Sequence, residues 1–398
     1  MDAVVTLKAL VARLEGLTET KEIEALRDWV ARGGIESLRP GIEFYLEQKL
    51  AFPDAVKRYT FLHGPISFTI HVSKKWKKVI AVMGDEHVTP AALSLENKDK
   101  AIDVATYLKG IVEAALAPID FYVEVGYLSA DKLTRHATKD SPLSHVRDAF
   151  EVCLTREKKG CPYKHLRAHY IDVRSSAPTS YGDLYRALHK VSHYITTPGK
   201  AKQLRDQVVL LRTLLEEIHP TLREELTDSK HILAWAGTVF NLPRITKQVN
   251  AISNVGLRAT LVAYIDQLIQ GALAKYGPDV LTYNTLLQAT RGLLDAKALP
   301  RDAAAYRNTL LKSASLLLHI GIIYVDYYAL ARMFRSFRQV EEVPSSDPTH
   351  IITYAGDAHA EHYRGFLRLL GFETTYQAKP TGTFQLLDIS AAPTPLFS

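Results

Sequence analysis

The chain has 398 residues, of which 47% are hydrophobic and 23% are charged, and its formal net charge is +6. This composition is typical of a globular protein and excludes a disordered chain. The length exceeds that of a typical domain, so one large domain with an insertion and two domains both fit it. The basic clusters at residues 74–78 and 156–159 fall where turns are expected. We interpret them as solvated loops and find no signal for nucleic-acid binding.

The two cysteines, Cys153 and Cys161, are too few to indicate a secreted disulfide framework. They flank a Lys/Gly loop and could pair or bind a metal, and paired thiols in a reducing compartment are the simplest interpretation. The first residues lack the basic start of a signal peptide, which indicates a cytoplasmic location. The longest apolar run, residues 316–330, is too short to cross a bilayer, so we expect a buried helix and no membrane span.

Helical spacing of apolar side chains over residues 3–32 predicts two helices, the second ended by Gly33 and Gly34. We expect this pair to form an N-terminal arm at residues 1–60. The arm would either cap the main domain or bind a partner.

The pattern changes to period two after Pro65, which predicts strands at residues 66–72 and 76–83. A helix over residues 98–116 and a strand over residues 119–126 follow. Strand, helix and strand make a βαβ unit with a parallel, right-handed crossover. Glu124 lies within the apolar run of the last strand, where an unpaired carboxylate would cost several kcal/mol. We expect it to have a partner, in a ligand-binding or catalytic role or in a structural salt bridge.

Residues 165–174 predict a polar strand in which Arg167 and Arg174 are candidates to bind an anionic cofactor or to hold a catalytic carboxylate. An edge strand near solvent explains the same residues. From residue 179 to about 340 the chain is mostly helical. His189 and His193 lie four apart on one of these helices, and we favour a surface or core pair over a metal site. His319 and Asp326 could reach a site, but satisfied core groups are slightly preferred.

The resulting prediction is an α/β fold with a mostly parallel sheet flanked by helices, a large all-helical insertion and an N-terminal helical pair. The first half of the core spans residues 61–178, the insertion residues 179–340, and a closing strand–helix–strand residues 341–398.

Two apolar runs end in the same short motif, Gly84-Asp-Glu-His87 and Gly356-Asp-Ala-His359. The second places His359 between the carboxyl end of a strand and the amino end of a helix, where open α/β sheets bind ligands. One such motif is a weak signal, but two with the same context favour a shared site. The alternative is two ordinary turns with exposed histidines.

These residues permit two kinds of chemistry. His87, His359 and Glu124, with Glu86 or Asp357, could hold a divalent metal ion that activates water. Without a metal, either histidine could act as general base while Glu124 holds the imidazole tautomer. The amino end of a helix predicts a lowered histidine pKa, which favours the neutral imidazole that both roles need.

The hairpin at residues 67–87, the strand with Glu124 and the C-terminal motif with its helix resemble the TraB/Tiki, ChaN and erythromycin-esterase-like superfamily. That resemblance implies a parallel α/β core with a variable helical insertion, and metal-dependent peptidase, histidine-based esterase or haem-binding activity. It assigns His87 and His359 as the motif histidines, Glu124 as the strand carboxylate and Glu86 as a further acid, with a small molecule or peptide as substrate.

The chain is also similar, over most of its length, to uncharacterised proteins of large double-stranded DNA viruses, through Cys161-Pro-Tyr, residues 167–174 and residues 326–334. This second resemblance implies a location in the cytoplasm or the virion. It also implies an alternative function, a catalytically silent protein that uses the fold to bind other virion or capsid proteins.

Overall fold

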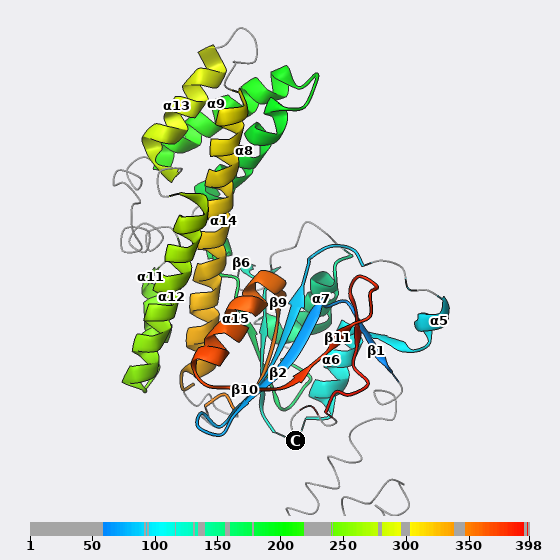
Figure 1. Ribbon diagram of the computed structural model, residues 1–398. Helices are drawn as coiled ribbons and strands as arrows, with labels where there is room; N and C mark the ends of the chain where they lie inside the picture. The colour runs from blue at the N-terminus through cyan, green and yellow to red at the C-terminus, as the bar shows by residue number, and fades with distance from the viewer. Residues whose placement is uncertain are drawn as a thin grey trace, which may run out of the picture.

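The computed structural model describes residues 59–90, 93, 95–115, 117–129, 132–133, 140–155, 160–176, 179–218, 240, 242–277, 281–295, 303–337, 347–393 and 396. The expected helical pair and nearly all of the arm at residues 1–60 lie outside them. The described part is a mixed α/β structure in which a body built on sheets carries a long helical projection (Figure 1).

The main sheet has six strands in the order β10-β2-β3-β9-β5-β8. Their bounds are β2 Ser67–Ser73, β3 Lys78–Asp85, β5 Ile119–Val123, β8 Leu166–Tyr170, β9 His350–Gly356 and β10 Glu373–Gln377. The pairs β3–β9, β9–β5 and β5–β8 are parallel, and β2 is antiparallel to β3 and β10. The α/β character and the presence of parallel strands are confirmed, with one feature that the sequence did not indicate: β9, from the end of the chain, separates β3 from β5.

The central strands are buried on both faces, and alternate side chains enter two different cores. On β3, Ile80 and Val82 pack with the helices of the projection and with α15 (Asp357–Leu369). Ala81 and Met83 pack on the other face with two further helices, α6 (Val104–Glu113) and α7 (Pro142–Leu154). The sheet is therefore the middle layer of the body.

The second face is covered by α6 (Val104–Glu113), α7 (Pro142–Leu154) and a small sheet of order β11-β12-β1-β4. The small sheet consists of β1 Phe61–His63, β4 Ala101–Asp103, β11 Lys379–Pro380 and β12 Leu386–Asp388. Asp103 ends β4, and its carboxylate caps α6 by accepting from the backbone of Ala105 at 2.9 Å. This is why α6 begins six residues later than the periodicity predicts.

Short elements complete the body: α5 Leu95–Lys98, β6 Tyr127–Ser129, β7 Lys132–Leu133 and the 3₁₀ turn η2 Val173–Ser176.

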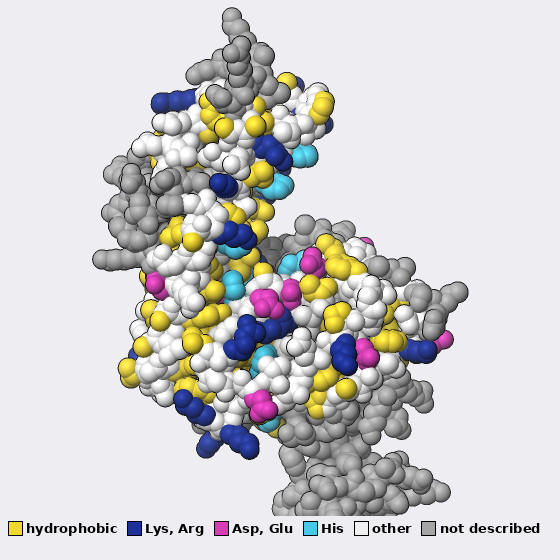
Figure 2. Space-filling view, in the orientation of Figure 1, with side chains coloured by type: hydrophobic (Ala, Val, Ile, Leu, Met, Phe, Trp, Pro, Cys, Tyr) yellow, Lys and Arg dark blue, Asp and Glu magenta, His cyan; other side chains and the backbone are white. Residues whose placement is uncertain are grey.

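At the β2–β3 turn, Lys74, Lys75 and Lys77 are exposed, but Lys78 is buried and donates to the carbonyl of Pro348. The solvated-loop interpretation therefore holds for the first three lysines of this cluster. Figure 2 shows basic and acidic side chains interspersed on this face of the body.

The projection is formed by helices between β8 and β9 (Figure 1). They are α8 Thr179–Ile195, α9 Ala201–Ile218, α11 Leu242–Asn250, α12 Val255–Tyr276, α13 Tyr283–Asp295 and α14 Ala303–Phe334. Helix α14 runs from the projection into the body, where it packs against α15. It is long and apolar enough to cross a membrane, but 78% of its most apolar window is buried within the protein, as in a core helix.

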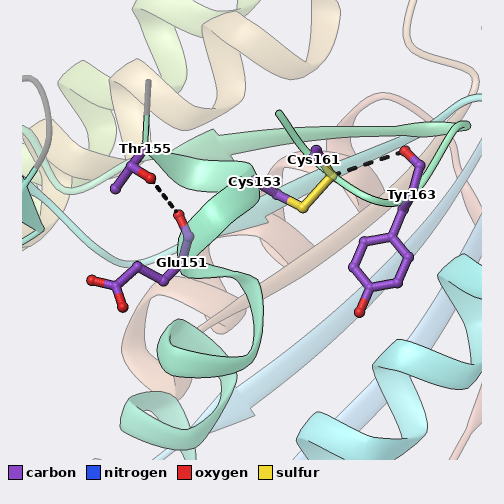
Figure 3. Close-up of a disulfide and its surroundings, with 5 residues drawn as sticks. All are labelled: Glu151, Cys153, Thr155, Cys161 and Tyr163. Atoms are coloured by element: carbon purple, nitrogen blue, oxygen red, sulfur yellow. Dashed lines mark hydrogen bonds between the residues drawn. A yellow bond between two sulfur atoms is a disulfide. The ribbon is translucent and has the colours of Figure 1, made fainter. Parts of the chain in front are cut away.

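Cys153 and Cys161 form a disulfide, so of the alternatives that the sequence leaves open, the structure has the paired cysteines (Figure 3). The bond joins the last turn of α7 to the segment that leads into β8, with Cα atoms 4.3 Å apart. The hydroxyl of Thr155 donates to the carbonyl of Glu151 at 2.9 Å and closes the helix beside it. The disulfide thus ties the end of a helix to the start of an edge strand.

Candidate active site

The two Gly-x-x-His motifs meet at one edge of the main sheet. Asp85, the last residue of β3, is in register with Gly356, the last residue of β9. The backbone N–H of Glu124, which directly follows β5, donates to the carbonyl of Tyr354 at 3.0 Å. Because the three strands are parallel and end at the same level, the side chains that follow them lie close together at one edge of the sheet. The predicted convergence of His87, His359 and Glu124 is therefore found.

Glu124 is the centre of this cluster. It is buried, and its Oε2 lies 3.1 Å from Nε2 of His87 and accepts from the backbone N–H of Gly356 at 2.7 Å. Its Oε1 lies 3.1 Å from Nε2 of His359 and accepts from the guanidinium of Arg174. Burial acts to raise the pKa of Glu124, but His359, His87 and Arg174 together hold it well below its usual value.

His87 is the partly open member of the cluster. Its side chain is 33% exposed, and its backbone adopts φ +57°, which non-glycine residues rarely do. The backbone N–H donates to Oδ1 of Asp85 at 3.1 Å, and Nδ1 lies 3.4 Å from Oδ2 of the same carboxylate. Burial acts to lower the pKa of His87, but hydrogen bonds with Asp85 and Glu124 raise it from 6.5 to about 9.

The acid beside His87 is therefore Asp85 and not Glu86. Asp85 ends β3 and is buried, whereas Glu86 begins the loop and is exposed. Asp85 also accepts from the backbone N–H of Leu143 at 3.0 Å. The position of Glu86 in the motif misled the prediction, since consecutive residues at a strand end point in opposite directions.

His359 is buried in the first turn of α15. Its Nδ1 lies 2.6 Å from Oδ1 of Asp326, and its Nε2 faces Glu124. The prediction of a lowered pKa is wrong. Burial does act to lower it, but Glu124 and Asp326 raise the pKa of His359 to about 10. Two carboxylates in direct contact outweigh the partial charge of a helix end.

Asp326 belongs to the site, although a core role elsewhere was slightly preferred. It lies on α14 and is fully buried, and its Oδ2 is 2.6 Å from Nδ1 of His362. His319, seven residues earlier, contacts the hydroxyl of Tyr276 at 3.2 Å instead. His362 was missed, although its spacing of three from His359 on one helix places both on the same face.

Of the two predicted arginines, Arg174 lies in the cluster and Arg167 lies outside it. Arg174 binds Glu124 and also Asp172, to which its Nε donates at 2.9 Å. Arg167 does not reach the site: it lies near the start of β8 and forms an ion pair with Asp120, close to the start of β5. Arg167 and Arg174 lie at opposite ends of β8 and its following turn, so Arg174 joins the cluster and Arg167 does not, and an anion-binding role for Arg167 stays a prediction.

Asp357 also points away from the site. Its carboxylate accepts from the hydroxyl of Ser67 and from Nη1 of Arg364 at 3.4 Å. A Cβ on Gly84 would lie 2.0 Å from Oδ1 of Asp357, so a larger residue there would displace this carboxylate. The metal-ligand role predicted for Asp357 is not supported by its position.

Gly356 makes room for the cluster itself, because a Cβ there would lie 2.8 Å from Nε2 of His87 and 3.3 Å from Oε2 of Glu124. Gly356→Ala is expected to displace His87, to cost about 1–3 kcal/mol of unfolding free energy and to lower any His87-dependent rate about 100-fold. Chemical denaturation and rate measurements check this. The matched control is Gly271→Ala on α12, whose Cβ would meet nothing within 4 Å. Equal stability and rates in the two variants would contradict the expectation.

The arrangement is that of a hydrogen-bonded ion network. Both imidazole Nε2 atoms face Glu124, and the guanidinium of Arg174 holds the same carboxylate. A divalent ion would need free imidazole lone pairs and would be repelled by the guanidinium. Among the residues that the structure describes, no group of three or more His, Cys, Asp and Glu side chains is placed to hold a metal ion. Proton transfer by protein groups is the chemistry that this arrangement fits, and the divalent metal stays a prediction.

Comparison with other proteins adds no relative: no protein-family model, no curated protein and no solved structure matches this chain.

Proposed function

We propose that the protein is a hydrolase of the TraB/Tiki and erythromycin-esterase-like type, in which His87 transfers protons. The observation that supports this most directly is a half-exposed imidazole held on a buried carboxylate, Glu124, which is itself fixed by Arg174, His359 and the backbone of Gly356. A buried charge network of this kind around a solvent-accessible histidine is typical of acid–base catalysis.

In the proposed reaction, Nδ1 of neutral His87, whose 3.4 Å contact with Asp85 is the longer of its two carboxylate contacts, gives up that contact and accepts a proton from a water molecule that attacks an ester or amide carbonyl. The proton then passes from His87 to the leaving group, which restores the neutral imidazole. Glu124 stabilises the imidazolium that forms between these two steps, and Asp85 holds the backbone N–H of His87. Arg174, whose side chain is 25% exposed beside Glu124, is placed to donate to a carbonyl oxygen as it gains charge.

The pH dependence tests this role. Because the pKa of His87 is raised to about 9, the imidazole is protonated at neutral pH and becomes a base only as the pH rises. The rate of hydrolysis should therefore increase about tenfold per pH unit from neutral pH and level off near pH 9. The measurement is a pH–rate profile on a panel of p-nitrophenyl esters and fluorogenic peptides, corrected for the uncatalysed reaction. A rate that is constant across this range would contradict His87 as the base.

A second candidate is a catalytically silent virion protein. The helices of the projection extend away from the body and offer a large surface for other virion or capsid proteins (Figure 1). In this case the ion network would serve only to hold α14 and α15 on the sheet. The same panel separates the two proposals, because the silent protein would turn over none of the substrates at any pH tested.

A further inference from the structure

The ion network continues past Glu124 into the projection. Nε2 of His359 contacts Glu124 at 3.1 Å, and its Nδ1 contacts Asp326 at 2.6 Å. The second oxygen of Asp326 contacts Nδ1 of His362 at 2.6 Å. A chain of side chains therefore joins α14 to the half-exposed imidazole of His87 through one buried histidine and two buried carboxylates.

We propose that Asp326 is a positioning residue of the site, which acts through His359 and Glu124 to set the protonation of His87. The use of this coupling in proton transfer rests on the proposed function. The electrostatic effect of Asp326 on His87 does not require catalysis. It means that a helix of the projection, far in sequence from both Gly-x-x-His motifs, supplies part of the working site. His362 holds the outer oxygen of Asp326 and fixes the direction of the carboxylate.

The groups around each member define the expected effect. His359 faces Glu124 and Asp326, with the ring of Tyr363 stacked beside it. Asp326 faces His359 and His362, and the phenols of Tyr264 and Tyr363 lie near enough to respond to its charge.

His87 faces Asp85 and Glu124, and Glu124 is shared with Arg174. With the charge of Asp326 removed, His359 loses its proton more readily. The positive charge beside Glu124 is then lost, so the field of Glu124 acts more strongly on His87 and the imidazole of His87 keeps its proton to higher pH.

The test is a histidine-ring NMR titration of the full chain, with the His87 signals assigned by their loss in a His87→Asn variant. Asp326→Asn should raise the titration midpoint of His87 by about half a pH unit or more. The matched control is Asp183→Asn, which removes a partly exposed carboxylate on α8 that forms an ion pair with Arg186. It should leave the His87 midpoint unchanged. A folded Asp326→Asn protein whose His87 midpoint is unchanged or lower would overturn the proposal.

A second variant tests the same coupling should Asp326→Asn fail to fold. His359→Gln removes the imidazolium directly and should raise the His87 midpoint in the same direction. In the double variant, Asp326→Asn should add no further rise, since its effect requires His359. A further rise in the double variant, or no rise in His359→Gln, would show that Asp326 does not act through His359. These titrations need no substrate, so their result is independent of whether the hydrolase proposal succeeds.

Discussion

Glu124→Gln is expected to lower the unfolding free energy by about 3–5 kcal/mol, because it removes a buried carboxylate that three cationic groups share. Glutamine has nearly the same shape, so the loss reports charge and hydrogen bonding and not a cavity. Arg174, His87 and His359 would remain close together without their common partner. Urea denaturation of the native and variant chains measures the difference.

The control for this change is Glu151→Gln, an exposed carboxylate on α7, which should shift the unfolding free energy by no more than about 0.5 kcal/mol. A Glu124→Gln protein that is as stable as this control would show that the network contributes little to the fold.

The pH dependence of stability gives an independent view of the same network. The pKa of His359 is raised from 6.5 to about 10, so its stabilising contribution is complete below pH 6.5 and is lost as the pH rises through 10. The pKa of Glu124 is lowered, so its contribution is present above the ordinary value of 4.5 and is lost in acid. The native chain should therefore be most stable near neutral pH. Glu124→Gln should flatten this profile on both sides.

His87→Asn is expected to lower the rate of hydrolysis by about 10²–10⁴-fold, the usual range for loss of an acid–base group. Asparagine is the suitable replacement because it adopts the left-handed backbone conformation of His87 more readily than other residues except glycine. The variant should keep its fold, since the side chain of His87 is partly exposed. Rates on the most active substrate of the panel, with circular dichroism as a check of folding, measure the effect.

The matched control is His193→Asn, which removes an exposed imidazole on α8 in the projection. It should keep full activity. A His87→Asn protein with more than about a tenth of the native rate would argue that His87 is not the acid–base group.

The strands that carry the site could be predicted from sequence, because each is a short apolar run that ends in a glycine or a carboxylate. The meeting of His87, His359 and Glu124 follows from one rule, that parallel strands place their carboxyl ends at one edge. The place of β9 between β3 and β5 could not be predicted, since strand order depends on long-range packing that periodicity does not report.

The remaining errors have the same physical origin. Asp326 lies in an apolar helix where a buried carboxylate has several structural explanations, and only the fold shows that His359 and His362 face it. Glu86 was assigned by the resemblance, and which of Asp85 and Glu86 faces His87 depends on the side of the strand end that each residue occupies. A shift of one residue in the predicted boundary reverses that assignment.

The position of β9 also bears on how the chain acquires its structure during synthesis. The two central neighbours of β9 are complete by residue 123, but the strand that joins them is made of residues 350–356. More than half of the chain must leave the ribosome before the gap between β3 and β5 can close. Until then, two apolar strand edges stay unpaired, which favours slow folding and exposes the nascent chain to aggregation. The helices between β8 and β9 are synthesised before β9 and can form from local contacts, whereas the sheet is completed only when β9 pairs with β3 and β5.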